Sequence, residues 1–381
     1  MDGLGVILDR IREDRLLHLL TDAVDVYSPS YAEAAATWVF TNALGRAGIP
    51  CRLEPVPAAM GDRSRANVVV QLGPDPAALL WVGHLDTVPL PDGSTAHGAR
   101  RDGDTLFGLG TADMKSGCAA MAEALVAVST AGIPLKRGLI VAFVVGEEEY
   151  GDGAMAFIQR NPLPPLTIIG EPTGLVPCTD HFGYLECLMT AEGIGAHAAL
   201  PEIGRNAIQA MLTWLAASLE RLGNLPAGDA IAINLRNIRG GGDKFEVPTR
   251  CEALLDVHLA PGGSAAEVLD RIGLARESVT SRRIRLDHKA SFHAAGYSLD
   301  PASPLLSPMR SAYERTGEPW APGAFRSHSD AALFREAGSS PILCGPGRLE
   351  LAHVAHESVE IPEVVRAAKL YAAMIHEACI R

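Results

Sequence analysis

The stretch ALLWVGHLD (residues 78–86) decides the fold, because an apolar run ends abruptly in a histidine and an aspartate. Two further runs end in the same way: LIVAFVVG (139–146) leads into three glutamates, and LTIIG (166–170) leads into Glu171. Such runs are typical of buried strands. Helical patterns separate them, for example at 114–131. Strands that alternate with helices predict an α/β fold, a mostly parallel sheet with helices on both faces.

The middle of the chain follows a different pattern. Its apolar residues partly alternate with polar ones, which favours a half-exposed sheet, and the predicted strands and helices lie at 184–193, 230–238, 251–259, 282–290, 206–222 and 264–275. We therefore predict an inserted, smaller α+β domain at 179–288, within a larger domain made of 1–178 and 289–381. Helical spacing also predicts single helices over 6–20 and 357–380.

Composition narrows the function. The chain has 381 residues and a net charge of −12, from 33 basic and 45 acidic residues, which argues against nucleic acid as the main partner. Seven cysteines occur without a CxxC pair, as expected for reduced thiols. The N-terminus lacks the apolar run of a signal peptide, and no stretch of about 18 apolar residues could span a membrane. We therefore expect a soluble, cytoplasmic protein.

Potential metal ligands follow the predicted strands. In open α/β sheets the carboxyl ends of the strands form the ligand crevice, so we expect these residues to meet at one edge: His84, Asp86, Asp113, Glu147, Glu148, Glu149, Glu171 and His353. Carboxylates crowded into a dry cleft repel one another, and a pair of divalent cations removes that repulsion. Mixed imidazole and carboxylate ligation without thiolates suits Zn²⁺, with Co²⁺ and Mn²⁺ as alternatives.

Spacing adds detail to this site. Asp86 stands two residues after His84, so in an extended chain both face the same side, and the carboxylate can accept a hydrogen bond from the ring nitrogen that does not bind metal. The three glutamates offer one ligand and one general base for a metal-bound water. Residue type alone does not say which glutamate takes which role.

Six blocks of sequence carry a resemblance to a known family: GHLDTVP (83–89), GLGTADMKSG (108–117), EEEYGDGA (147–154), IGEPT (169–173), GAHAALPEIGRNAI (195–208) and GPGRLELAHVAHES (345–358). In this order they resemble the M20 metallopeptidases, most closely the acetylornithine deacetylase and succinyl-diaminopimelate desuccinylase branch. The resemblance implies a dinuclear metal hydrolase that cleaves the amide bond of a small N-acyl amino acid. It also implies a homodimer formed through the smaller domain.

The resemblance assigns roles to single residues. The family usually has Asp-Glu-Glu where this chain has three glutamates, which makes Glu148 the general base. The implied metal ligands are His84, Asp113, Glu149, Glu171 and His353, with Asp113 bridging the two metals. His197 resembles the histidine that stabilises the oxyanion of the tetrahedral intermediate, and in the family it comes from the partner subunit.

The substrate-reading positions depart from the family. His258 follows Asp256 where an arginine is frequent, and Ser327–Asp330 replaces a Gly-Thr-Ser-Asp block. We therefore expect an unusual substrate, with Arg326 as the group that binds its carboxylate. His258 and His328 are candidates for substrate contact or for packing.

Two other functions fit the same residues. The first is an M20-type dipeptidase, a carboxypeptidase or a hydrolase of another C–N bond. The second is a non-catalytic protein of the same fold that holds metal and binds a ligand. The complete set of predicted ligands argues against the second, because a decayed relative should have lost some of them.

Overall fold

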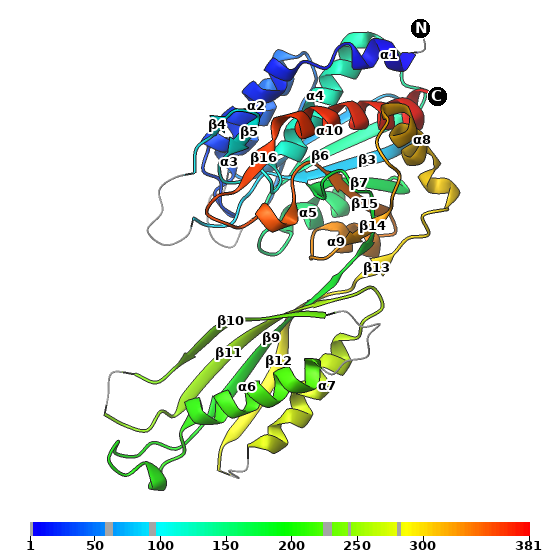
Figure 1. Cartoon of the computed structure of the whole chain (residues 1–381). Helices are drawn as coiled ribbons and strands as arrows, with labels where there is room; N and C mark the ends of the chain where they lie inside the picture. The colour runs from blue at the N-terminus through cyan, green and yellow to red at the C-terminus, as the bar shows by residue number, and fades with distance from the viewer. Residues whose placement is uncertain (1–2, 58–63, 91–96, 224–230, 243–244, 280–282) are drawn as a thin grey trace. The chain divides into compact units, whose positions relative to one another are not determined.

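The computed structural model describes residues 3–57, 64–90, 97–223, 231–242, 245–279 and 283–381 (Figure 1). The chain divides into two structural units. The first consists of Met1–Thr179, Leu299–Phe325 and Ser329–Arg381, and the second of Asp180–Ser298 with Arg326–His328. The second unit thus ends ten residues later than the predicted residue 288. The reason is strand β12 (Arg285–Ala294), which pairs with its neighbour along its length, so that a boundary at 289 would cut through a paired strand.

The large sheet of the first unit is parallel in its centre. Its strands β6, β3, β7 and β15 run in one direction, with Val82 paired to both Ala142 and Ile169. The order is β1-β2-β6-β3-β7-β15-β8, and the bounds are β1 (Cys51–Pro55), β2 (Ala66–Leu72), β3 (Ala77–His84), β6 (Gly138–Val144), β7 (Leu166–Pro172), β8 (Cys178–His181) and β15 (Ser340–Gly345). The parallel register brings the carboxyl ends of β3, β6 and β7 to one edge. The predicted fold class is confirmed.

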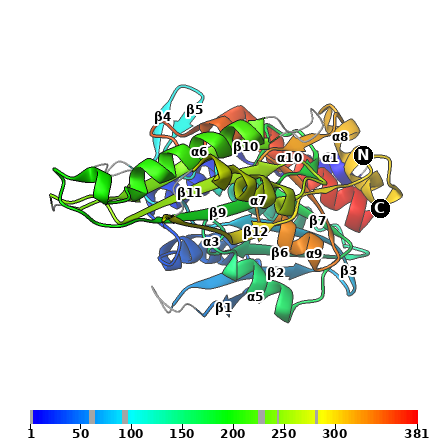
Figure 2. The same cartoon turned by 90° about the horizontal axis from the view of Figure 1, so that it is seen from below.

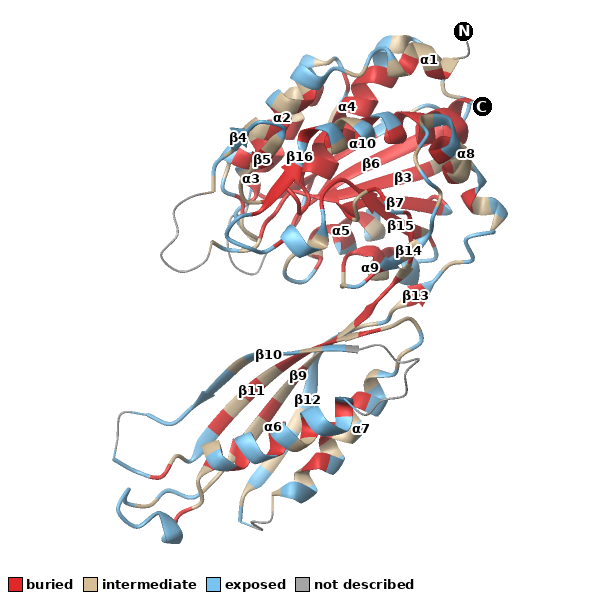
Figure 3. Cartoon of the chain, in the orientation of Figure 1, coloured by how far each residue is buried: buried red, intermediate tan, exposed pale blue. Residues whose placement is uncertain are grey.

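Helices cover this sheet and bury it. They are α1 (Gly3–Leu8), α2 (Glu13–Asp25), α3 (Ala34–Arg46), α4 (Lys115–Ala131), α5 (Asp152–Arg160), α8 (Ser307–Thr316), α9 (Ala331–Glu336) and α10 (Ile361–Ile375). The main core packs α4 and α10 against the sheet through Trp81, Phe143 and Tyr371, all fully buried, and Figure 3 shows β3, β6 and β7 buried along their length. A side chain at Gly117 would lie 2.2 Å from the carbonyl oxygen of Gly170, so glycine lets α4 approach β7.

Two helices predicted from spacing differ in the structure. The segment 6–20 is interrupted after Leu8, where the backbone N–H of Arg12 donates to the Glu123 carboxylate at 2.7 Å. The segment 357–380 begins with strand β16 (Ser358–Glu360), which pairs with β5 (Thr105–Phe107); β5 pairs in turn with β4 (Arg100–Asp102) in a small sheet. Both differences arise from contacts remote in sequence, which helical spacing does not reveal.

The second unit is an antiparallel sheet with helices on one face (Figure 2). Its strand order is β10-β11-β9-β12, and its elements are β9 (Gly183–Glu192), β10 (Ile231–Gly240), β11 (Arg250–Leu259), β12 (Arg285–Ala294), α6 (Ala207–Gly223) and α7 (Ala265–Leu274). Burial alternates strictly along β9, where Leu185 and Cys187 join a core around Trp214. Predicted strand residues 230 and 282 lie outside the described residues.

The remaining short strands are β13 (Tyr297–Ser298), which pairs with Asp180 and His181 of β8, and β14 (Gly323–Phe325). Among the described residues, no helix combines the length and the apolar character needed to cross a membrane.

Candidate metal centre

Strand ends and the loops after them deliver the candidate ligands within the first unit. His84 is the last residue of β3, Glu171 lies near the end of β7, and Glu148 follows β6. Asp113 precedes α4, and His353 follows β15 after a short helical turn. These five residues therefore come from separate segments that the parallel sheet brings to one edge.

Asp113 lies between two imidazoles. Its Oδ1 is 3.0 Å from Nε2 of His84, and its Oδ2 is 3.5 Å from Nε2 of His353. The Nε2 of His353 is also 3.1 Å from a carboxylate oxygen of Glu148. A carboxylate that offers one oxygen to each of two imidazoles has the arrangement that bridges two metal ions.

The three consecutive glutamates separate in space. Glu148 belongs to the group in which ligand atoms of His84, Asp113 and Glu148 all lie within 4.8 Å of one another. Glu147 is mostly buried, and its Oε2 is 3.9 Å from Nε2 of His84. Glu149, in contrast, is exposed. The structure therefore does not bring the predicted ligand Glu149 into the cluster, and it places Glu148, the predicted base, beside His353.

The electrostatics of the cluster show a shortage of positive charge. Burial raises the pKa of Glu147, Glu148 and Glu171, which also lie close to other carboxylates. Burial alone would lower the pKa of His353, but its hydrogen bonds to Asp113 and Glu148 raise it to about 11. The three glutamates thus shift toward holding a proton, as buried carboxylates do when no cation neutralises them, whereas, although burial alone would raise it, the hydrogen bonds from His353 and His84 lower the pKa of Asp113.

These residues fit a pair of divalent cations. Oε1 of Glu171 is buried and has no hydrogen-bond partner among the described residues, and Glu171 Oε2 lies 4.0 Å from Nε2 of His84. Two imidazoles and three carboxylates without a thiolate match the donor set that Zn²⁺, Co²⁺ and Mn²⁺ accept.

Asp86 acts differently from the expected contact with His84. The Nδ1 of His84 lies 3.0 Å from the backbone carbonyl oxygen of Asp86 and 3.6 Å from its carboxylate. The carboxylate instead accepts the backbone N–H groups of Glu147 and Glu148 at 3.2 and 3.1 Å, and the hydroxyl of Ser30 at 2.7 Å. Its backbone orients the histidine, while its side chain holds the chain that carries the glutamates.

Glu357 is a site residue that received no role from the sequence. Its carboxylate accepts the backbone N–H groups of Gly110, Ala112 and Asp113 at 2.9 to 3.0 Å, which fixes the loop before α4. Burial raises the pKa of Glu357 to about 7. The only signal in the sequence was its place four residues after His353.

The other predicted site residues belong to the second unit. His197 is exposed, and its Nδ1 accepts the backbone N–H of Ala199 at 3.1 Å. The rings of His258 and His328 lie 5.1 and 5.8 Å from the ring of Tyr184. Arg326 is exposed, with its guanidinium 5.8 Å from the ring of Phe182.

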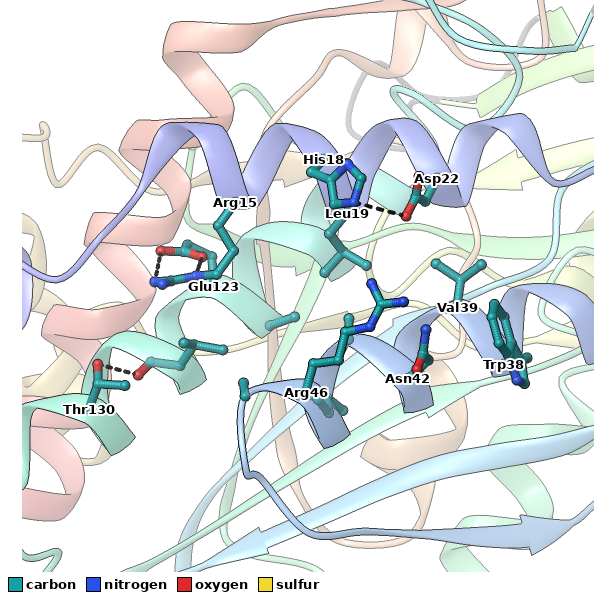
Figure 4. Close-up of a pocket in the computed structure, with 15 residues that line it drawn as sticks. Arg15, His18, Leu19, Asp22, Trp38, Val39, Asn42, Arg46, Glu123 and Thr130 are labelled. Carbon is teal, nitrogen blue, oxygen red and sulfur yellow. Dashed lines mark hydrogen bonds and ion pairs between the residues drawn. The ribbon is translucent and has the colours of Figure 1, made fainter.

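Two of the cavities in the described part of the first unit differ in their relation to the cluster. One, of about 460 Å³, lies between α2, α3 and α4, and none of the cluster residues lines it; Figure 4 shows that its buried carboxylate, Glu123, is paired with Arg15. The other, of about 380 Å³, is lined by Val354–Glu357, which directly follow His353, and by Arg100 and Phe107. Of these two cavities, the second borders the segment that carries His353.

Comparison with known proteins identifies the family and the fold. Residues 80–377 match the model of a family described as peptidase family M20/M25/M40. The fold resembles aminopeptidase PepT from Bacillus cereus ATCC 10987 (20% identity, 97% of this chain and 99% of that one, TM-score 0.77). It also resembles human carnosine dipeptidase 1 (15% identity, 98% of this chain and 99% of that one, TM-score 0.76). A third similar structure is a hydantoinase/carbamoylase family amidase from Burkholderia ambifaria (15% identity, 97% of this chain and 98% of that one, TM-score 0.67). At these identities the solved structures show a shared fold.

Proposed function

The chain belongs to peptidase family M20/M25/M40, and from this premise we propose that it hydrolyses the peptide bond of short peptides. The chain is a metal-dependent hydrolase of amide or peptide bonds, as the family match indicates. The observation that carries the proposal is the Asp113 carboxylate, which faces His84 with one oxygen and His353 with the other.

Five residues of the cluster would hold two divalent cations, with Zn²⁺ the first candidate and Co²⁺ and Mn²⁺ the alternatives. Asp113 would be shared, and the other ligands would be His84, Glu171, Glu148 and His353. When bound, the cations polarise the scissile carbonyl and make a water molecule acidic enough to supply hydroxide at neutral pH.

Glu147 is the proposed general base. Its carboxylate is mostly buried beside His84, and burial raises its pKa, as in other enzymes that tune a glutamate for proton transfer. Glu147 would take a proton from the attacking water and pass it to the leaving amine. The resemblance implies that Glu148 is the base and Glu149 the metal ligand. The proposal instead makes Glu147 the base and Glu148 the metal ligand.

Three matched variants test this assignment. We expect Glu147→Gln to lower kcat by about 10²- to 10⁴-fold, the usual contribution of general acid–base catalysis, and to keep its metal. Glu148→Gln should lose metal, because an amide replaces an anionic ligand. Glu149→Gln should stay within about 2-fold of wild type in kcat, since exposed groups remote from the chemistry contribute little. Metal content and steady-state kinetics measure all three.

The opposite result would support the assignment that the family resemblance implies. If Glu149→Gln lost metal while Glu147→Gln remained active, Glu148 would be the base and Glu149 the ligand.

The cavity beside His353 supports a small substrate. Its volume of about 380 Å³ is at the lower end of the range for small-molecule sites, and the exposed Arg100 guanidinium on its wall can bind a carboxylate in bidentate fashion. The family description and the names of PepT and carnosine dipeptidase 1 favour short peptides. N-acyl amino acids are the second candidate, because six sequence blocks resemble the deacetylase and desuccinylase branch.

A substrate panel distinguishes these candidates. Dipeptides, tripeptides, and N-acetyl and N-succinyl amino acids are compared by kcat/KM, first with wild type and then with Arg326→Ala. A preference for the acyl amino acids would overturn the peptide proposal. Arg326 would have no part in carboxylate binding if its variant kept wild-type kcat/KM on the preferred substrate.

We also propose a homodimer formed through the second unit. Leu212 and Leu219 of α6 are 54% and 39% exposed, and their seven-residue spacing puts them on one helix face. Leu235 and Ile238 are exposed on the edge strand β10. Because Nδ1 of His197 accepts a hydrogen bond, its Nε2 carries the proton and can donate to an oxyanion.

Subunit mixing tests both parts of this proposal. Leu212→Glu combined with Leu219→Glu should give a monomer by light scattering. If His197 acts on the partner's centre, inactive Glu147→Gln and inactive His197→Ala proteins should regain activity when mixed as heterodimers. Two inactive parents that stay inactive after verified subunit exchange would show that His197 does not act in trans.

A further inference from the structure

Arg65 is a buried cation held between two carboxylates, just before β2. Its side chain is 0% exposed. The guanidinium donates to Glu33 at 3.0 and 2.8 Å and to Asp152 at 2.5 and 2.9 Å. Its face also lies 4.9 Å from the ring of Tyr31. Such double bidentate pairing requires the planar fork of arginine.

The first arm of this pairing fixes the loop that carries the glutamates. We call residues 146–151 the glutamate loop. Asp152 directly follows it, and a side chain added at Gly146 would lie 2.6 Å from Nη2 of Arg65 and 2.1 Å from Oδ1 of Asp152. The loop is closed by the backbone N–H of Gly151, which donates to Gly146 at 2.8 Å. Both ends of the glutamate loop thus meet the Arg65–Asp152 pair.

The second arm reaches the same loop from the other side. Glu33 accepts the backbone N–H of Tyr31 at 2.9 Å, and Ser30 of the same segment donates its hydroxyl to Asp86. Asp86 in turn accepts the backbone N–H groups of Glu147 and Glu148. A closed circuit of hydrogen bonds and short segments of chain therefore runs from Arg65 through Glu33, the segment 30–31, Asp86, the glutamate loop and Asp152 back to Arg65.

We propose that Arg65 is a positioning residue, which sets the places of Glu147 and Glu148 through this circuit. The inference rests on the proposed function, because it concerns the two glutamates to which that function assigns the base and a metal ligand. Arg65 itself bonds to neither of their side chains in the described contacts. Its single charge lies between two carboxylates that would otherwise repel each other next to the loop.

Arg65→Lys is the principal test, because lysine keeps the charge and loses the fork. We expect kcat to fall by about 10-fold or more, since a shift of about 1 Å in a catalytic group can cost up to about 10²-fold in rate. KM should stay within about 3-fold, as no substrate contact is removed. The visible absorption spectrum of the Co²⁺-loaded protein should change, because Glu148 would be displaced.

Arg15→Lys is the matched control. Arg15 makes the same bidentate pair with Glu123, at 2.7 and 2.6 Å, and the Glu123 side chain is 1% exposed. This pair joins α2 to α4 in the same unit (Figure 4). We expect Arg15→Lys to lower the unfolding temperature while leaving kcat and the Co²⁺ spectrum unchanged.

Asp152→Asn provides a second variant in case Arg65→Lys does not fold. It keeps the shape of the side chain and weakens one arm of the circuit, so it should change kcat and the Co²⁺ spectrum in the same direction. Arg65 would be only a structural residue if these variants and Arg15→Lys lowered the unfolding temperature alike, with kcat and spectrum unaltered. Should wild type cleave nothing on the panel, the proposed function fails, whereas the Co²⁺ spectrum still tests Arg65.

Discussion

Two groups of histidines in this molecule have opposite electrostatic surroundings. In the first unit, His84 and His353 lie among carboxylates, which raise the pKa of His353 to about 11 although burial alone would lower it. In the second unit, His181 and His328 lie among aromatic rings and each other, and burial lowers their pKa to about 3 and about 4. The same side chain is therefore driven toward the cation in one group and toward the neutral form in the other.

The difference shows which group requires a ligand. The carboxylates around His84 and His353 exceed the positive charge available, so a divalent cation would improve the free energy of that cluster. The second group consists of imidazoles packed against aromatic rings, and the buried Nδ1 atoms of His258 and His328 have no hydrogen-bond partner among the described residues. His258 and His328 both pack against the ring of Tyr184, and a substrate contact of either histidine stays a prediction.

Removing metal should have the largest effect on activity and stability, and it should act only through the group around His84 and His353. We expect a chelator to abolish hydrolysis and to lower the free energy of unfolding by about 4 kcal/mol, if metal was present at 1,000 times its dissociation constant. The carboxylates left behind would repel one another. Activity assays and urea unfolding, before and after restoring Zn²⁺, Co²⁺ or Mn²⁺, measure the effect. Full activity and unchanged stability in demonstrably metal-free protein would contradict the proposed centre.

Lowering the pH should reduce the free energy of unfolding through His181 and His328, with a smaller effect than metal removal. The folded pKa values of His181 and His328 lie below the ordinary value of 6.5, so their contribution to stability is complete above pH 6.5 and declines as the pH falls toward 4. The slope is at most about 1.4 kcal/mol per pH unit for each histidine. We expect His328→Phe, which keeps a ring against Tyr184, to lose less stability between pH 7 and pH 5 than wild type.

Urea unfolding of metal-free protein at pH 7, 6 and 5 measures this difference, since the absence of metal removes the acid-driven loss of cations from both proteins. Equal slopes for wild type and His328→Phe would mean that His328 is protonated in the folded state at pH 5.

Local sequence was sufficient to predict the sheet edge. Apolar runs end at His84 and close to Glu171, and parallel strands place their carboxyl ends together, so the sequence predicted that these residues meet. The predicted partners Asp113 and His353 also lie in the cluster. The alternation of strands and helices predicted the confirmed fold class, because strands that are buried on both faces have nearly continuous apolar sequences.

The glutamate triplet was not resolvable from sequence. Three identical residues in a row offer no difference in residue type, and a one-residue change redirects a side chain. The backbone path sets where each glutamate side chain lies: Gly146 adopts a φ of 78°, and Asp86 accepts the backbone N–H groups of both Glu147 and Glu148. That path leaves the Glu147 side chain only 11% exposed and Glu149 exposed.

The sequence by itself thus determined the family, the class of chemistry and the residue types gathered at one sheet edge, because these depend on composition, spacing and short motifs. Only the tertiary structure decided which glutamate faces His84, which atom of Asp86 contacts its ring, and that Arg65 closes a circuit around the glutamate loop. These features depend on hydrogen bonds between segments up to 87 residues apart in sequence, and local sequence patterns carry no record of such contacts.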